Sequence, residues 1–133
     1  DKPAKSHAFA ALPPTAEFED VFFYGIQSPI HALGLLCERV EQPNMDDDWL
    51  AQVKRRIETA AVVVADLTGA DPRVYLQLGY AWGKNRPTIL LAKAGSPLLL
   101  DISRHAPIWY ERIKDVDSAL SAALDTLKTQ GLI

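Results

Sequence analysis

The sequence predicts an α/β domain with a flavodoxin-like, five-stranded parallel sheet in the order 2-1-3-4-5 and helices on both faces. Short apolar runs alternate with amphipathic helical segments along the chain, which is the pattern of a parallel sheet. The clearest run, Ala61–Ala65, is apolar at every position, as a strand buried on both faces requires. Right-handed crossovers then restrict how such strands connect. A chain of 133 residues is long enough for one such domain.

The first part of the chain alternates strand, helix and strand. Residues 1–5 are polar and are expected to be loose, so the domain covers 6–133. An apolar run over 6–12 predicts a strand that ends at two prolines. A helix follows, capped by Thr15 and running to Leu33. The second predicted strand covers 35–40.

Three consecutive aspartates, Asp46 to Asp48, precede the next predicted helix, which covers 49–60. An acidic N-terminus caps a helix and interacts favourably with its dipole. A calcium loop would need interleaved oxygen ligands and a glycine, which this segment lacks. The aspartates are therefore interpreted as a helix cap, and we expect no metal site in the chain.

The remaining elements follow the strand at Ala61–Ala65. Asp71-Pro72 is a helix-start signal, with aspartate at the cap and proline at the first helical position, and this helix ends near Gly83. The elements expected after it are a strand over 87–92, an apolar segment over 98–102, an extended segment over 108–110 and a final helix over 116–129.

Composition excludes several classes of protein. A net charge of −3 and a pI of about 5.5 give no general attraction to nucleic acid or to an anionic membrane. No apolar run approaches the ~20 residues that a membrane span needs, and no signal peptide is visible. The single cysteine, Cys37, fits a reducing compartment, so a cytoplasmic location is expected. Because the chain opens with Asp1, we interpret it as a module of a longer protein or a trimmed chain.

One residue in the helix over 71–83 is chemically unusual. Gln77 is the only strongly polar side chain between Val74 and Trp82. An amide in so apolar a helix is either hydrogen-bonded within the core or directed into a pocket. Ligands of sheets with this strand order bind beyond the carboxyl ends of strands one and three. The helix that carries Gln77 starts at that edge.

The run from Asp66 to Ala81, DLTGADPRVYLQLGYA, resembles the signature of nucleoside 2-deoxyribosyltransferase-like domains. Relatives of these domains include Toll/interleukin-receptor (TIR)-like effectors that cleave NAD. The opening of the chain, from Phe9 to Ile26, is similar to the first strand and helix of the family. Segments 99–102 and 108–110 are similar to its final strands, so the resemblance covers nearly the whole chain.

The resemblance implies a set of site residues. The catalytic glutamate of the family corresponds to Gln77, and the aspartate that lies near the sugar or base corresponds to Asp71. Asparagine is commoner in the family where Arg73 stands, and methionine-proline-phenylalanine is commoner where Leu12-Pro13-Pro14 stands. The residues expected to contact substrate are Leu12, Pro13, Asp66, Thr68, Gly69, Asp71 and Arg73. From the residues alone, Asp66 either accepts hydrogen bonds from loop amides or contacts a ligand.

The expected function follows from the same resemblance. It implies an NAD+ glycohydrolase that releases nicotinamide and ADP-ribose, in an immune-effector module that acts in antiviral defence. NAD is the expected substrate and no cofactor is needed. With Gln77 in place of the glutamate, the chain is expected to be inactive. The alternatives are a nucleoside 2-deoxyribosyltransferase or nucleotide N-glycosidase, and a non-catalytic nucleotide-binding or oligomerisation module. TIR-like sites are often completed by a neighbouring protomer, so a homo-oligomer is a further expectation.

Overall fold

The computed structural model describes residues 6–41, 44–99 and 105–133. Five strands form one sheet in the order β2-β1-β3-β4-β5, and every neighbouring pair is parallel, which confirms the predicted fold class. The strands are β1 (His7–Ala11), β2 (Leu36–Glu38), β3 (Val62–Asp66), β4 (Thr88–Lys93) and β5 (Ile108–Tyr110). Of the segments predicted from the sequence, 1–5 and 100–102 lie outside the described residues. Leu98 and Leu99 form no strand, and the fifth strand is β5.

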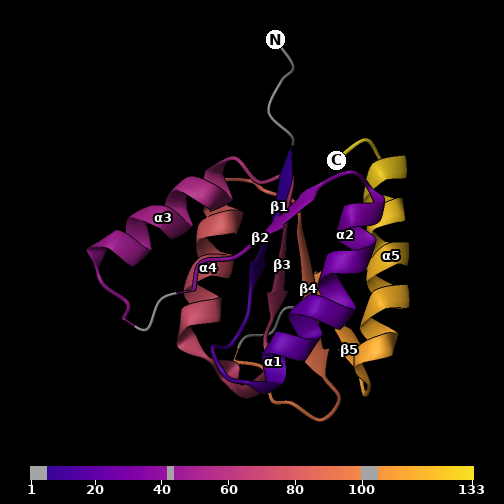
Figure 1. Ribbon diagram of the computed structural model, residues 1–133, viewed down its shortest axis with the longest axis horizontal. Coiled ribbons are helices and arrows are strands. Elements are labelled where there is room, and N and C mark those ends of the chain that lie inside the picture. Colours follow the sequence, from indigo (N-terminus) through magenta and orange to yellow (C-terminus); the bar gives the residue numbers. More distant parts are fainter. Residues whose placement is uncertain (1–5, 42–43, 100–104) are drawn as a thin grey trace.

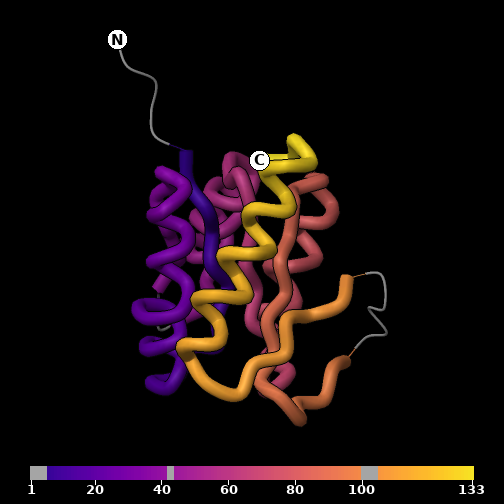
Figure 2. Tube along the Cα trace, turned by 90° about the vertical axis from the view of Figure 1, so that its right-hand side faces the viewer, coloured from indigo at the N-terminus to yellow at the C-terminus, as the bar shows by residue number. Residues whose placement is uncertain are grey.

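Helices cover both faces of the sheet (Figure 1). One layer holds α3 (Asp47–Glu58) and α4 (Pro72–Gly83). The other holds α5 (Ile113–Thr129) beside a continuous helical stretch of α1 (Glu17–Asp20), η1 (Val21–Ile26) and α2 (Gln27–Ala32). Figure 2 shows α5 crossing the sheet on the side of this second layer. No helix in the described ranges is long and apolar enough to cross a membrane.

The central strand β3 divides its side chains between two cores. Val62 and Val64 pack in the cluster beneath α5, whereas Val63 and Ala65 pack in the cluster beneath α3 and α4. Successive side chains of a strand point to opposite faces, so a strand in the middle of a covered sheet must be apolar throughout. Val62 to Ala65, which belong to the predicted apolar run, are all buried, and the strand extends one residue further than predicted, to the buried Asp66.

The first helical stretch differs from the prediction. It was expected to start at a Thr15 cap, but its first helical residue is Glu17 and no side-chain cap hydrogen bond is present. Within the stretch, η1 is a π-helix, and Pro29 follows it in α2. Proline has no N–H to donate to the carbonyl four residues before it, and its ring crowds that carbonyl. A wider helical segment just before Pro29 is consistent with that constraint.

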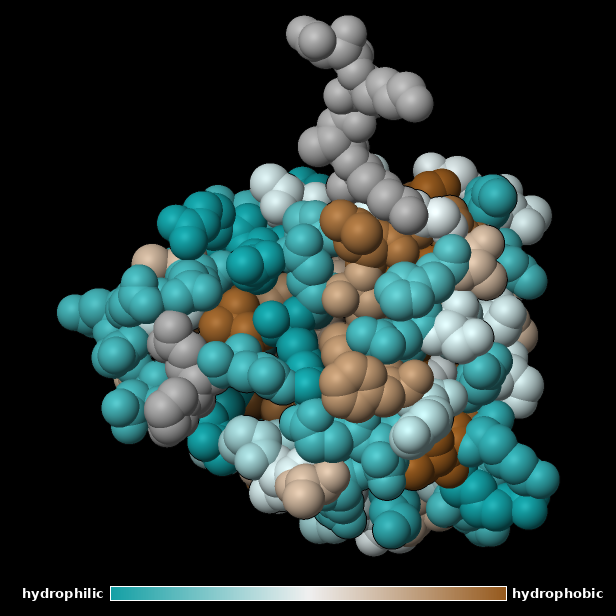
Figure 3. All heavy atoms as spheres, viewed as in Figure 1, coloured by the Kyte–Doolittle hydropathy of each residue, from teal (hydrophilic) through white to brown (hydrophobic). Residues whose placement is uncertain are grey.

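The edge strand β2 is shorter than the predicted 35–40 segment. Figure 3 shows polar side chains over α3 and apolar ones near the middle of this face. Exposed apolar side chains in the β2 and η1 region include Leu36 and Phe23. Cys37, also on β2, is half-buried, and burial raises the pKa of its thiol to about 12. The thiol therefore stays protonated and is a poor nucleophile.

Candidate functional site

A cavity of about 410 Å³ lies beyond the carboxyl ends of β1 and β2. The segment after β1 contributes Leu12 and Pro13, which were both predicted to contact substrate. The helix that follows β3 contributes Arg73 and Gln77. In this strand order the chain leads from β1 to β2 on one side and from β3 to β4 on the other, so the strand order reverses between β1 and β3. The structure therefore brings four of the predicted residues together in one cavity, at the expected edge of the sheet.

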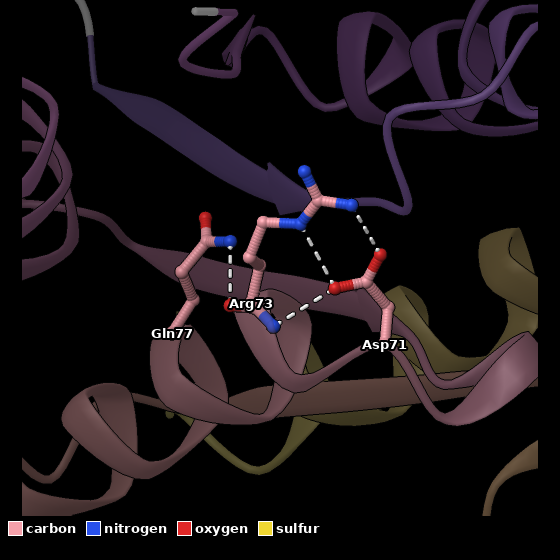
Figure 4. A network of polar contacts seen from close by, with 3 residues as sticks. All are labelled: Asp71, Arg73 and Gln77. Carbon is pink, nitrogen blue, oxygen red and sulfur yellow. Dashed lines mark hydrogen bonds and ion pairs between the residues drawn. The ribbon is translucent and has the colours of Figure 1, made fainter. Parts of the chain in front are cut away.

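Helix α4 places Gln77 in the wall of this cavity. The helix starts as predicted, with Asp71 at the cap and Pro72 in the first turn. Gln77 is only 7% exposed, and its Nε2 donates a hydrogen bond of 2.9 Å to the main-chain carbonyl of Arg73 (Figure 4). Within the described chain, no residue donates a hydrogen bond to its Oε1, which points away from that carbonyl in Figure 4. The acceptor end of the amide is thus open to a ligand.

Asp71 holds the side chain of Arg73 in place. Its Oδ1 accepts hydrogen bonds from the main-chain N of Arg73 at 2.9 Å and from Nε at 3.0 Å, and its Oδ2 accepts one from Nη2 at 2.9 Å. The Arg73 guanidinium lowers the pKa of the Asp71 carboxyl, and that carboxylate in turn raises the pKa of Arg73. Asp71 is therefore both the helix cap and the residue that orients Arg73, although it does not line the cavity itself.

The opposite side of the cavity is formed by residues that the sequence did not single out. Arg39, just after β2, donates a hydrogen bond of 2.8 Å to Glu19 of α1 and forms an ion pair with Glu41. Its guanidinium also stacks on the Phe22 ring, 4.1 Å from the ring centroid. Arg39, Glu19 and Glu41 all line the cavity. Their only sequence signal is that Arg39 lies at the end of the predicted 35–40 strand and Glu41 directly follows it, at the edge where ligands bind.

Trp49 supplies an apolar surface to the same cavity. It lies in the first turn of α3, where Asp46 caps the helix by accepting a hydrogen bond of 2.9 Å from the Trp49 main-chain N. This confirms the capping role predicted for the acidic segment. Among the described residues, no group of three or more histidine, cysteine, aspartate or glutamate side chains could hold a metal ion.

Besides Asp71, three of the predicted substrate contacts do not line the cavity: Asp66, Thr68 and Gly69. Asp66 is fully buried, and its carboxylate accepts hydrogen bonds from the Thr68 main-chain N at 2.9 Å and from the Tyr110 hydroxyl at 2.6 Å. Thr68 in turn accepts a bond from the Lys93 main-chain N at 2.8 Å. The hydrogen bond predicted between Asp66 and a loop amide is thus confirmed. A contact of Asp66 with a ligand remains a prediction.

The direction of the Asp66 side chain explains its separation from Gln77. Asp66 follows Val62 and Val64 in the two-residue period of β3, so it shares their face beneath α5, where Tyr110 is also buried. Gln77 belongs to α4, which covers the other face. Burial raises the pKa of Asp66, and burial together with the nearby carboxylate raises the pKa of Tyr110. The hydrogen bond between Tyr110 and Asp66 therefore links β5 to the end of β3.

Comparisons with known proteins agree with this geometry. No protein-family model matches the sequence, and no curated protein matches it. Among solved structures, the CMP N-glycosidase of Clostridium botulinum superposes with a TM-score of 0.65 and 17% identity, over 88% of this chain and 99% of the other. A 2-deoxyribosyltransferase from Bacillus psychrosaccharolyticus superposes with a TM-score of 0.56 and 17% identity, over 84% of this chain and 90% of the other. The chain therefore has the α/β fold of the nucleoside 2-deoxyribosyltransferase-like proteins.

Proposed function

We propose that this domain binds a nucleoside or nucleotide in the cavity with its N-glycosidic bond beside Gln77. The site is one for cleaving that bond, and glutamine at position 77 leaves it able to hold a ligand but not to turn it over. The observation that carries this proposal is Gln77 itself. It is a nearly buried amide in the cavity wall, and its acceptor oxygen has no donor in the part of the chain that the structure describes. It stands at the position where the family that the sequence resembles has its catalytic glutamate.

The chemistry of the bond explains why this residue matters. Cleavage of an N-glycosidic bond passes through an oxocarbenium-like centre, which a carboxylate stabilises by charge or traps covalently. The Oε1 of Gln77 can accept a hydrogen bond from a sugar hydroxyl, but it carries no full charge and is neither a base nor a nucleophile. Losing such a group lowers the rate by about two to four orders of magnitude.

The identity of the substrate is a separate part of the proposal. The sequence resemblance supports NAD+, whose hydrolysis would give nicotinamide and ADP-ribose and would fit an immune-effector module. The fold neighbours support other nucleosides, because one is a CMP N-glycosidase and the other a 2-deoxyribosyltransferase. All three substrates share an N-glycosidic bond between a ribose-type sugar and a base. The reaction class is therefore common to them, and substrate choice is decided by measurement.

The test compares the chain with its Gln77→Glu variant on NAD+, on CMP, and on a 2′-deoxynucleoside with a second free base. We expect the variant to release or exchange a base from at least one of them at a rate at least about a hundredfold above that of the chain with Gln77. Chromatography of the products identifies the reaction. The variant Gln130→Glu, which makes the same change at an exposed position after α5, should stay inactive.

Other outcomes separate the alternatives. If both proteins are inert but one of these ligands raises the melting temperature, the domain is a binding module without catalysis. If neither turnover nor binding is seen with any of them, the proposed function is wrong. Measuring the rate per protomer over a range of protein concentrations shows whether a second copy completes the site, because the specific activity then rises with concentration.

A further inference from the structure

The guanidinium of Arg73 is a hydrogen-bond donor whose orientation is already set. Two of its three nitrogens, Nε and Nη2, donate to Asp71. The third nitrogen, Nη1, has no acceptor among the residues that the structure describes. Figure 4 shows it pointing away from Asp71. The Arg73 side chain is 37% exposed against 15% for Asp71, and Arg73 but not Asp71 lines the cavity.

The two arginines of the cavity differ in how their charge is used. Arg39 is shared between the carboxylates of Glu19 and Glu41, and an aromatic ring covers one face of its guanidinium. Among the described residues, Asp71 is the one carboxylate partner of Arg73, and both of its oxygens are engaged on the edge opposite Nη1. The cavity therefore has an acidic side around Arg39 and one open cationic edge at Arg73.

An open guanidinium edge held in one orientation suits a phosphoryl group. Hydrogen bonds between arginine and phosphate are charge-assisted and therefore stronger than neutral ones, and a held side chain loses little further entropy on binding. A cavity of about 410 Å³ lies near the lower end of the ~300–1,000 Å³ range of ligand pockets, which favours a mononucleotide over a dinucleotide.

We infer that the Asp71–Arg73 pair is a preset anion-binding unit that makes the cavity select a nucleoside 5′-monophosphate over the corresponding free nucleoside. The inference rests on the proposed function, because it places at Arg73 the phosphate of a ligand whose sugar lies beside Gln77. Within this arrangement Asp71 is a positioning residue: its two side-chain hydrogen bonds fix the orientation of Arg73, which lines the cavity, whereas Asp71 itself does not line it.

The test measures binding by calorimetry for CMP against cytidine and for AMP against adenosine. At least one monophosphate should bind about tenfold or more tightly than its nucleoside. In Arg73→Gln this preference should disappear, so that nucleoside and monophosphate bind with equal affinity. Arg73→Lys keeps the charge but loses the two-point hold of Asp71, so it should retain only part of the preference. Lys84→Gln removes one positive charge from the end of the same helix, outside the cavity, and should leave the preference intact.

Two results would overturn the inference while leaving nucleoside binding in place: equal affinity for nucleoside and monophosphate, or a preference that survives in Arg73→Gln. Absence of binding by all four compounds would instead count against the proposed function. Inorganic phosphate provides an independent check by NMR of arginine Nε–H groups. The anion unit requires the Arg73 resonance to shift with phosphate in the unaltered chain, and a resonance that does not move contradicts it.

Discussion

The amide of Gln77 uses its two ends for different purposes. The donor end completes a hydrogen bond to the Arg73 carbonyl within the helix, and the acceptor end has no donor among the described residues of this cavity-lining side chain. An ionised glutamate has no hydrogen for that carbonyl, so in Gln77→Glu the carboxylate must either turn into the cavity or hold a proton, which raises its pKa. Glutamine is thus well suited to the helix wall and poorly suited to catalysis.

Asp66 and Tyr110 give a prediction about a buried polar pair. Replacing Tyr110 with phenylalanine leaves Asp66 Oδ2 buried without a donor, and we expect the free energy of unfolding to fall by about 1–3 kcal/mol at pH 7. Burial already raises the pKa of Asp66, and losing the hydroxyl raises it further. Burial favours the neutral form of the Asp66 carboxyl. The contribution of Asp66 to the free energy of unfolding is therefore present in acid and is lost as pH rises through the pKa of Asp66 in the folded protein.

Urea unfolding of the two proteins at pH 7 and at about pH 4 measures this effect. The loss of stability in Tyr110→Phe should be larger at the higher pH. Tyr24→Phe, which removes a hydroxyl from a side chain that is mostly exposed, serves as the control and should be nearly neutral. Equal unfolding midpoints for Tyr110→Phe and the unaltered chain would show that the buried bond contributes nothing.

At the scale of elements, α4 is the helix that organises the site. Its first turn is set by local sequence, because Asp71 caps it and Pro72 has the backbone angle that a first helical residue needs. Residues 73 and 77 then lie one turn apart on the same face, and both reach the cavity. One locally specified helix start therefore positions the orienting carboxylate, the arginine and the glutamine together.

Substitutions at Asp71 separate its capping role from its ion pair. Asparagine caps a helix as well as aspartate does but cannot pair with Arg73, whereas alanine loses both interactions and should cost about 1 kcal/mol or more. Arg73 lowers the pKa of Asp71 in the folded protein. The stabilisation by the ionised carboxylate is therefore present above about pH 4 and is lost as pH falls through the lowered pKa.

The difference in unfolding free energy between the unaltered chain and Asp71→Asn should accordingly shrink between pH 7 and strongly acidic solution. Urea titrations across that range measure it. Asp125→Asn, on the exposed side of α5, provides a matched loss of a carboxylate outside the site. A difference that stays constant with pH would show that the ion pair does not stabilise the fold.

At the scale of the whole molecule, the layer beneath α5 is held by a close contact between helices. A Cβ atom placed on Gly25 of η1 would lie 3.0 Å from the Val116 side chain of α5. We therefore expect Gly25→Ala to destabilise the protein by about 1–3 kcal/mol through overpacking. Gly79 of α4 has open space around its Cβ position, so Gly79→Ala should instead stabilise by about 0.5–1 kcal/mol.

Thermal and urea unfolding of these two alanine variants measure the contrast, since each change adds the same methyl group to a helical glycine. Opposite shifts are expected for the two proteins. A stabilised Gly25→Ala would mean that the helices separate easily, in which case close packing does not hold this layer together.

Local patterns predicted the positions of the strands and the start of α4, because apolar runs and cap residues act over a few positions. Gln77 was identified from the same kind of signal. The strand order followed from the alternation of strands with helices and from right-handed crossovers. The first helical stretch was predicted less well: Thr15 does not cap it, and η1 was not foreseen. Its course depends on Pro29 and on packing against α5, and packing between distant segments leaves no local pattern.

The sequence by itself determined the fold class, and it predicted the edge of the sheet and the residue, Gln77, around which the cavity is found. Only the tertiary structure decided which other side chains join it. Asp66 lies near Gln77 along the chain but faces the other layer, because side chains alternate across a strand. Arg39 and Glu19 are 20 residues apart along the chain, yet they form one wall of the cavity. Folding brings the ends of separate elements together at one edge of the sheet, and that juxtaposition is set by long-range packing, which no short stretch of sequence encodes.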